Sequence, residues 1–159
     1  MWERIWKKCK VFVGHNCLFD WLYLYHNLVA PLPDNYFDWK KAMAANNRHF
    51  YDTKYIAMQE PSIFGDRTKL ENLVPTIRER KQKLITMQSQ GVFSKYSLDK
   101  QALHEAGYDS FMTAWVYQQM TLLVKDYQKY SNHLNIMRSF FFMDFSRDQD
   151  IVNPYVPVP

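Results

Sequence analysis

The first thirty residues change twice between a helical and an extended pattern of hydrophobic positions. Apolar side chains at positions 2, 5, 6 and 9 follow the i, i+3, i+4, i+7 spacing of an amphipathic helix. The run Val11–Gly14 is short and hydrophobic, which predicts a strand buried on both faces. A second helix is predicted next, with Asn16 as its cap, the Pro-Leu-Pro at 31–33 as its end, and an apolar stripe of Leu18, Trp21, Leu22, Tyr25 and Val29.

The pattern then predicts another helix and another strand. Asp34 is placed to cap a helix that runs to about Ala45. Residues 50–57, "FYDTKYIA", predict a strand whose apolar residues are interrupted by Asp52 and Lys54.

Further along, the periodicity predicts one short helix, a loop and one long helix. Thr68 and Glu71 form a capping-box pattern before a helix that Pro75 should shorten or kink. Residues 81–97 are polar and contain a glycine, which favours a connecting loop. From Asp109 to about Lys129 the chain predicts its strongest helix, with one apolar side formed by Met112, Trp115, Val116, Met120, Leu123 and Tyr127.

This order of elements predicts an α/β fold with parallel strands. Two predicted strands make a poor sheet by themselves, because both would be edge strands. The C-terminal "NPYVPVP" cannot form a central strand. We therefore predict a domain over residues 1–145 and a tail or linker over residues 146–159.

Composition narrows the class of protein. With 159 residues, 47% hydrophobic and 17% aromatic, the chain is long enough for one packed domain but not comfortably for two. A net charge of +4 permits a polyanionic partner without requiring one. No apolar run reaches the roughly 18 residues of a membrane span, and the N-terminus lacks the apolar core of a signal peptide. Cys9 and Cys17 lack metal-ligand spacing and favour free thiols in a reducing compartment, so we expect an intracellular protein of the nucleus or cytoplasm.

Three polar residues near predicted helix starts are candidates for chemistry. Each has a structural explanation when it is taken alone: Asp20 as a solvated acid, His104 as a structural histidine, and Asp109 as a helix N-cap. Together they follow a specific order, because "GHNxxxD" follows a strand, "DTK" lies on the next predicted strand, and "HEAGYD" opens the long helix.

In these segments the chain resembles the CAF1-type group of DEDDh 3′–5′ exonucleases, which includes poly(A)-specific ribonucleases and piRNA-trimming exonucleases. The matching segments are "VGHNCLFD", the Pro-Leu-Pro at 31–33, "YDTK", "LHEAGYD" and "NHLNIMRS", which span nearly the whole chain. The resemblance implies a ribonuclease H-like fold that hydrolyses RNA from its 3′ end, particularly poly(A), with two Mg²⁺ or Mn²⁺ ions.

The resemblance also assigns roles to matching positions. Asp20 and Asp109 would be catalytic metal ligands, and His104 would orient or deprotonate the attacking water. Lys54 is a candidate phosphate contact because of its position on a predicted strand beside this site, and a surface lysine is an equal alternative. The chemistry is consistent with these residue types, because two ions about 3.5–4 Å apart stabilise both the attacking and the leaving oxygen, and Mg²⁺ takes hard oxygen ligands. Asp20 and Asp109 should therefore converge on one site.

The chain departs from the family pattern in one respect. The family's first two acids form an Asp-x-Glu on the first strand of the sheet, and no Asp-x-Glu occurs in these 159 residues. The resemblance thus implies an incomplete ribonuclease H-like fold, with the first strands of the sheet missing. We expect this chain to be inactive alone and prone to aggregate at the strand edge left without its neighbour.

Two other interpretations stay open. The chain could be a non-catalytic module that binds RNA or a protein partner through its aromatic and basic residues, or a structural domain in which the matches are accidental. The sequence alone therefore leaves open whether the chain is itself an enzyme. The expected partners are an RNA 3′ end, the missing N-terminal half, and a second copy of the chain.

Overall fold

The computed structural model describes residues 2–80, 84–87, 90–91, 94–98 and 105–154. His104 lies outside this described part of the chain. The described helices and strands, in chain order, are α1 (Trp2–Lys8), β1 (Val11–Gly14), α2 (Leu18–Leu28), α3 (Tyr36–Ala44), β2 (His49–Asp52), α4 (Thr53–Gln59), α5 (Pro61–Phe64), α6 (Leu70–Arg78), α7 (Ala106–Leu123), the 3₁₀ helix η2 (Tyr127–Tyr130), β3 (His133–Leu134), β4 (Phe141–Asp144) and β5 (Ile151–Val152).

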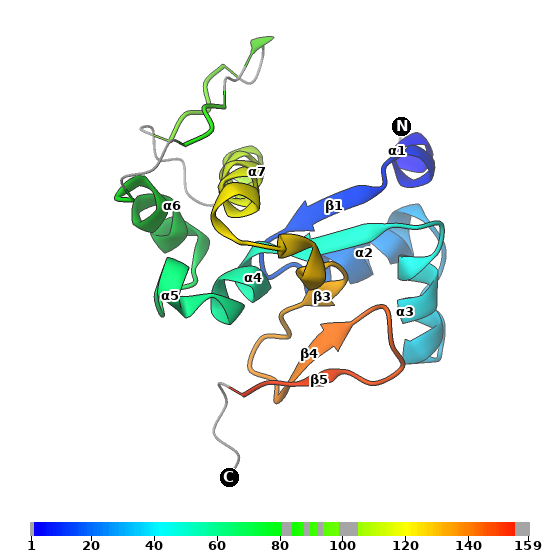
Figure 1. Cartoon of the computed structure of the whole chain (residues 1–159). Helices are drawn as coiled ribbons and strands as arrows, with labels where there is room; N and C mark the ends of the chain where they lie inside the picture. Colours follow the sequence, from blue (N-terminus) through cyan, green and yellow to red (C-terminus); the bar gives the residue numbers. More distant parts are fainter. Residues whose placement is uncertain (1, 81–83, 88–89, 92–93, 99–104, 155–159) are drawn as a thin grey trace.

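A mixed sheet in the order β1-β2-β3-β4-β5 forms the centre of the fold (Figure 1). The pairs β1·β2 and β2·β3 are parallel, with Val11 opposite His49 in the first pair. The pairs β3·β4 and β4·β5 are antiparallel. The α/β class with parallel strands is therefore confirmed, and the sheet gains three strands that the hydrophobic pattern did not predict.

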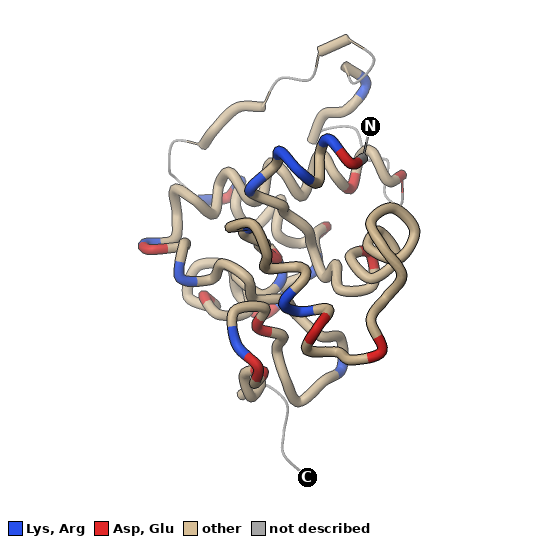
Figure 2. Tube along the Cα trace, turned by 90° about the vertical axis from the view of Figure 1, so that its right-hand side faces the viewer, with Lys and Arg blue, Asp and Glu red and all other residues tan. Residues whose placement is uncertain are grey.

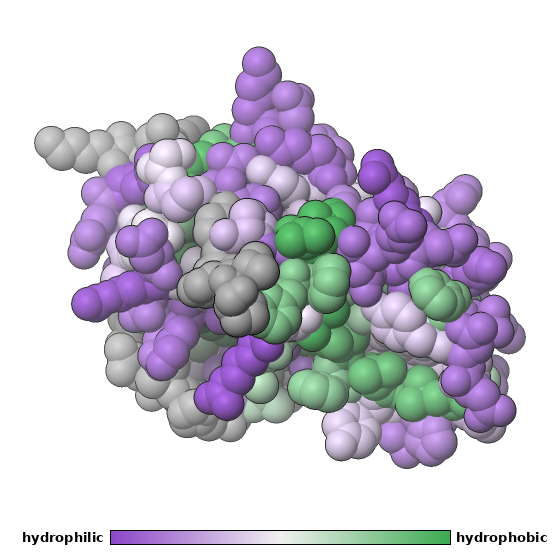
Figure 3. All heavy atoms as spheres, turned by 90° about the horizontal axis from the view of Figure 1, so that it is seen from below, coloured by the Kyte–Doolittle hydropathy of each residue, from purple (hydrophilic) through white to green (hydrophobic). Residues whose placement is uncertain are grey.

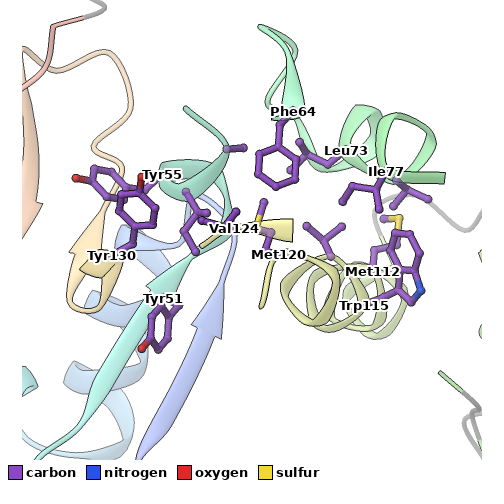
Figure 4. Packing of buried hydrophobic residues seen from close by; sticks show 14 of the residues in the cluster. Tyr51, Tyr55, Phe64, Leu73, Ile77, Met112, Trp115, Met120, Val124 and Tyr130 are labelled. Atoms are coloured by element: carbon purple, nitrogen blue, oxygen red, sulfur yellow. The ribbon is translucent and has the colours of Figure 1, made fainter. Parts of the chain in front are cut away.

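Alternate strand residues supply two cores on the opposite faces of the sheet, as the period of a strand requires. Phe12 and Phe50 stack at 5.2 Å between ring centroids in the core formed with α1, α2 and α3. The neighbouring Tyr51 faces the other core, which α4, α5, α6 and α7 cover. Figure 4 shows how the second core is filled by residues labelled Tyr51, Tyr55, Phe64, Leu73, Ile77, Met112, Trp115, Met120, Val124 and Tyr130.

One predicted element differs from the structure around residue 52. The predicted strand 50–57 was wrong after its first half, because β2 ends at Asp52 and residues 53–59 form α4. The Asp52 side chain accepts a hydrogen bond from the Lys54 amide and so caps this helix. Lys54 therefore lies in the first turn of a helix and not on a strand.

Three predicted caps were also wrong. Asn16 does not cap α2, whose N-cap is Cys17; Asn16 has φ of +56° and holds other segments through its amide and side chain. The cap of α3 is Asn35, whose side chain accepts from the Phe37 amide, and not Asp34. Lys69 and not Thr68 stands at the N-cap of α6.

The remaining helix predictions agree in type and differ at the ends. The helix α6 is only nine residues long and contains Pro75, as predicted. The long helix α7 starts three residues before Asp109 and ends at Leu123, with η2 following it. Within the loop between α6 and α7, Ile85 is fixed to α7, because its amide donates to the Gln119 side chain and its carbonyl accepts from Trp115 Nε1.

The C-terminal part of the described chain packs on the sheet. Within 146–159, where a tail or linker was expected, Ile151–Val152 pair with β4. The Asp150 carboxylate also forms an ion pair of 2.6 Å with Lys40, whose side chain is 2% exposed.

Basic and acidic residues are interspersed along the trace in the view of Figure 2. Hydrophobic side chains gather on the face seen from below, the side on which β4 and β5 lie in Figure 1 (Figure 3). Among the described helices, none combines the length and the apolar character that a membrane crossing needs.

Candidate functional site

A pocket of about 920 Å³ lies beside the carboxyl ends of β1 and β2. The first turns of four helices line it, with Asp20 from α2, Lys54 from α4, Glu71 from α6 and Asp109 from α7. Carboxyl ends of parallel strands are a common position for ligand sites in α/β folds. Helix N-termini carry partial positive charge, which stabilises carboxylates there and attracts anions.

The structure brings together three of the four residues that the sequence singled out. Asp20 and Asp109 line this same pocket although 89 positions (109 − 20) separate them, and Lys54 lines it as well. Asp109 is not a helix N-cap, because Glu105 has that position and the Asp109 amide donates to its carbonyl. The fourth residue, His104, lies outside the described residues.

The acids of the pocket supply part of a metal-binding set. Asp20 and Asp109 offer the hard carboxylate oxygens that Mg²⁺ prefers. Within the part of the chain that the structure describes, no group of three or more His, Cys, Asp or Glu side chains is close enough to hold an ion. The residues present therefore fit a divalent ion in kind and fall short of a complete coordination set in number.

Asp52 is the residue of this region that sequence reasoning missed as a functional candidate. Its side chain is 0% exposed and bonds to the backbone of Asn16 and Lys54, two residues that line the pocket. One carboxylate oxygen accepts from the amides of Asn16 at 2.8 Å and Lys54 at 2.9 Å, and the other accepts from the Asn135 amide at 3.1 Å. Burial raises the pKa of Asp52, while these amide hydrogen bonds oppose the rise.

A signal for Asp52 was available in the sequence. An acid inside the otherwise apolar run "FYDTKYIA" is costly to bury unless its oxygens are satisfied. An Asp followed by a helix-compatible segment is also a common N-cap. Its long-range partners could not be read from the pattern, because Asn16 and Asn135 lie 36 and 83 positions away.

His15 is held as a neutral imidazole at the edge of the pocket. The hydroxyl of Thr53 donates to the Gly14 carbonyl at 3.2 Å, so it accepts at 2.9 Å from Nδ1–H of His15. Burial, and secondly the charge of Lys54, lower the pKa of His15 to about 4. At neutral pH its Nε2 is therefore an acceptor and a very weak base.

The two cysteines are free thiols in different surroundings. Cys9 is exposed and Cys17 is buried. The Cys17 sulfur accepts from Trp21 Nε1 at 3.1 Å, and burial raises the pKa of its thiol. A Cβ at Gly14 would come within 2.2 Å of this sulfur, so only glycine fits where β1 meets α2.

Comparison with known proteins connects this chain to one family. A model of the CAF1 family ribonucleases matches residues 1–117 of the chain. The pre-piRNA 3′-exonuclease trimmer of Bombyx mori is 34% identical over 114 residues, which cover 68% of this chain and 21% of the relative. Poly(A)-specific ribonuclease PARN of Danio rerio is 31% identical over 119 residues, which cover 74% and 18%. The 3′-5′ exoribonuclease parn-1 of Caenorhabditis elegans is 28% identical over 160 residues, which cover 94% and 26%.

The chain thus spans between 18% and 26% of the length of these relatives. The matched family has a DEDD-type, ribonuclease H-like fold, and the mixed α/β sheet described above agrees with it in class. The resemblance predicted from "GHNxxxD", "DTK" and "HEAGYD" is confirmed by the family match, because all three motifs fall within residues 1–117. This chain belongs to the CAF1 family of ribonucleases.

Proposed function

We propose that this chain is the C-terminal portion of the nuclease domain of a 3′–5′ exoribonuclease, and that the complete domain removes nucleotides from poly(A) or related RNA 3′ ends. The observation that carries this proposal is the pocket at the ends of β1 and β2, where Asp20, Lys54 and Asp109 meet in a chain of the CAF1 family. The names of the relatives, which act on poly(A) or on piRNA precursors, support the class of substrate.

In the proposed site each residue of this chain has one task. Asp20 and Asp109 would hold divalent ions through carboxylate oxygens, and such ions would supply charge stabilisation for the attacking and leaving oxygens of the phosphodiester. Lys54 holds a phosphate of the RNA backbone in place beside them. His104 orients or deprotonates the attacking water, since an imidazole with an ordinary pKa near 6.5 accepts a proton at neutral pH.

The same proposal explains why this chain should be inactive alone. The sequence has no Asp-x-Glu, and the described residues form no cluster of three metal-binding side chains. Among the described strands β1 is at one end of the sheet. We place a strand bearing Asp-x-Glu along this edge, next to the pocket, in the complete domain.

The test compares this chain alone with a completed enzyme, in which a CAF1-family N-terminal segment bearing Asp-x-Glu is supplied in cis or as a second chain. A 5′-labelled oligo(A), with a 3′-labelled control, is incubated with Mg²⁺ and with or without chelator. We expect chelator-sensitive shortening from the 3′ end by the completed enzyme and none by the lone chain.

Substitutions in the completed enzyme test the individual roles. Asp20→Ala, Asp109→Ala and His104→Ala should each reduce the rate by roughly a thousandfold, because loss of metal-based charge stabilisation costs several kcal/mol and each 1.36 kcal/mol is tenfold in rate. RNA binding should change little. Asp38→Ala serves as a matched control, because Asp38 is an exposed acid in the first turn of α3 and does not line the pocket. Full activity of the Asp109→Ala enzyme would end the metal-ligand role, and trimming by the lone chain would show that the catalytic acids lie elsewhere.

A second candidate function is a non-catalytic RNA-binding module. Phe19 and Tyr23, 59% and 69% exposed, lie one turn apart on α2, the helix that carries Asp20. Exposed rings of this kind can stack on unpaired bases. Tight, chelator-independent binding of oligo(A) by the lone chain that Phe19→Ala and Tyr23→Ala weaken, with no activity in any completed form, would favour this function.

A further inference from the structure

Two adjacent side chains at the junction of β2 and α4 bond to residues that line the pocket. Asp52 and Thr53 are both 0% exposed. The Asp52 carboxylate accepts three amide hydrogen bonds, from Asn16, Lys54 and Asn135. The Thr53 hydroxyl donates to the Gly14 carbonyl and accepts from the His15 ring. Together they bond to every residue of the turn 14–16.

This turn leads directly into the part of the site that carries an acid. Gly14 ends β1, and α2 begins at Leu18 with Asp20 in its first turn. Asn16 has φ of +56°, a backbone conformation that an asparagine adopts only at some cost, so the hydrogen bonds to its amide and its side chain oppose a relaxation of the turn.

The same carboxylate fixes two further segments of the pocket wall. Lys54, whose amide it accepts, is itself a lining residue. The Asn135 amide belongs to the segment after β3, which reaches the pocket at Met137. Asn135 also donates from its side chain to Asn16 at 2.6 Å, so the segment after β3 and the turn 14–16 are bonded to each other as well as to Asp52.

We propose that Asp52, assisted by Thr53, is a positioning residue of the nuclease site: it sets the turn 14–16, and through it the first turn of α2, so that Asp20 meets Lys54 and Asp109 in a working geometry. This inference rests on the proposed function for its catalytic consequence. Its structural part, that Asp52 and Thr53 hold the turn 14–16, concerns this chain alone.

Substitutions that keep the shape of the side chain distinguish an effect on the geometry of the site from an effect on folding. In Asp52→Asn one acceptor becomes an NH₂ group, which faces an amide donor in place of accepting from it. Thr53→Val keeps the shape of the side chain and removes both hydroxyl hydrogen bonds, whereas Thr53→Ser keeps the hydroxyl. Asp52→Ala is avoided, because it would leave buried donors without partners.

Two control substitutions match these changes elsewhere in the fold. Asp144→Asn alters another buried carboxylate, 1% exposed, whose partners are Ser146, His133 and Arg147. Thr76→Val removes a half-buried hydroxyl that donates to the Asn72 carbonyl within α6. None of these residues lines the pocket at the ends of β1 and β2.

The first readout is amide hydrogen exchange in the chain itself, measured well below its melting temperature. Asp52→Asn should speed exchange at the amide that the new NH₂ group faces, either Asn16 or Asn135, because these two amides bond to different oxygens of the carboxylate. Thr53→Val should loosen the turn 14–16 and the first turn of α2. Thr53→Ser should restore wild-type protection there. The controls should leave these amides unchanged. Unchanged protection of both Asn16 and Asn135 in Asp52→Asn, with unchanged protection of the turn 14–16 in Thr53→Val, would overturn the inference whether or not any form of the protein is an enzyme.

The second readout is the kcat and KM of the completed enzyme at the same temperature. We expect Asp52→Asn to lower kcat by about tenfold or more, equivalent to 1.36 kcal/mol of transition-state stabilisation for each factor of ten. KM should stay within about twofold, Thr53→Val should follow in the same direction, and Thr53→Ser should recover the rate. Asp144→Asn and Thr76→Val should lower the melting temperature without this loss of kcat.

The two readouts distinguish the possible failures. Loss of protection at Asn16 with unchanged kcat would overturn the positioning role and leave the proposed function intact. A completed enzyme that cleaves no RNA would overturn the proposed function, while the exchange data would still decide whether Asp52 and Thr53 hold the turn. Equal losses of kcat in Asp52→Asn and Asp144→Asn would show a general effect of folding and contradict the inference.

Discussion

Buried polar side chains are used differently in the parallel and antiparallel halves of the sheet. In the parallel half, β1 and β2, the Asp52 carboxylate bonds to backbone amides of three separate segments. In the antiparallel half, β3 to β5, the buried Lys40 side chain forms an ion pair with Asp150 at 2.6 Å. The buried Asp144 carboxylate lies 3.5 Å from the His133 ring and accepts from the amide of Ser146, only two positions away.

The two kinds of interaction have different consequences: one positions the segments of the pocket, and the other holds elements of the fold together. Hydrogen bonds to the backbone fix where chain segments lie, and three of those segments line the pocket. Charge pairs fasten one element to another: Lys40 lies on α3, and Asp150 lies in the connection between β4 and β5. Changes in the antiparallel half should therefore reduce stability and spare the site, whereas changes in the parallel half should alter the site.

The largest loss of stability is expected from Lys40→Met. This change leaves the Asp150 carboxylate, 17% exposed, without its cation, and breaking a buried pair on one side costs about 3–5 kcal/mol. Urea denaturation should show this fall in the free energy of unfolding. Lys41→Met, at the exposed neighbouring lysine, should change it by less than about 0.5 kcal/mol.

The double variant Lys40→Met with Asp150→Leu sharpens this prediction. It removes both charges and should recover much of the loss, since an apolar pair of similar size avoids the isolated charge. A loss in the free energy of unfolding below about 1 kcal/mol for Lys40→Met would show that the pair is screened like a surface salt bridge. It would contradict the inference that this pair holds α3 to the connection between β4 and β5.

A smaller, pH-dependent loss is expected from His15 in the parallel half. Its pKa of about 4 in the folded chain lies below the ordinary value of 6.5, so the unfolded chain binds a proton first as the pH falls. The contribution of neutral His15 to the free energy of unfolding is fully present above pH 6.5 and is lost as the pH falls from 6.5 to about 4. The decrease should reach about 2 kcal/mol, given 1.36 kcal/mol for each pKa unit and the partial exposure of the ring.

Denaturation at a series of pH values tests this prediction. In His15→Gln the free energy of unfolding should depend less on pH between 6.5 and 4, and the exposed His26→Gln should keep the wild-type slope. An identical slope for His15→Gln and the wild type would place the titrating group elsewhere.

The smallest effect on folding, and a clear effect on association, is expected at the two ends of the sheet. Val11 of β1 and Val152 of β5 are both exposed, at 51% and 62%. The edge of β1 is four residues long, whereas β5 has two and is followed closely by Pro154, which cannot donate a ladder hydrogen bond. We expect the lone chain to associate through β1, and Val11→Lys to reduce this association more than Val152→Lys.

Static light scattering over a range of concentrations measures this difference directly. Neither substitution should change the melting temperature of the dilute chain by more than a few degrees. A wild-type chain that stays monomeric throughout, with a sharp cooperative melt, would contradict an unsatisfied edge at β1 and favour a self-sufficient binding module.

The hydrophobic pattern and the motifs determined a large part of this protein. A short hydrophobic run predicted β1, and a helical period with apolar residues on one face predicted α2 and α7. The order of "GHNxxxD", "DTK" and "HEAGYD" indicated the family, and with it the candidate residues Asp20, Lys54 and Asp109. Their assigned catalytic roles stay predictions.

Tertiary structure decided what local pattern does not contain. The strands β3 and β5 have two residues each, too few to show a period of two, and exist because β2 and β4 provide partners. Asp52 looked like an interruption of a strand, and its role comes from amides 36 and 83 positions away. Hydrogen bonds of this range form only when the fold brings separate segments together. The sequence therefore indicated the candidate residues Asp20, Lys54 and Asp109, and only the packed chain showed that Asp52 bonds to the segments that carry the pocket.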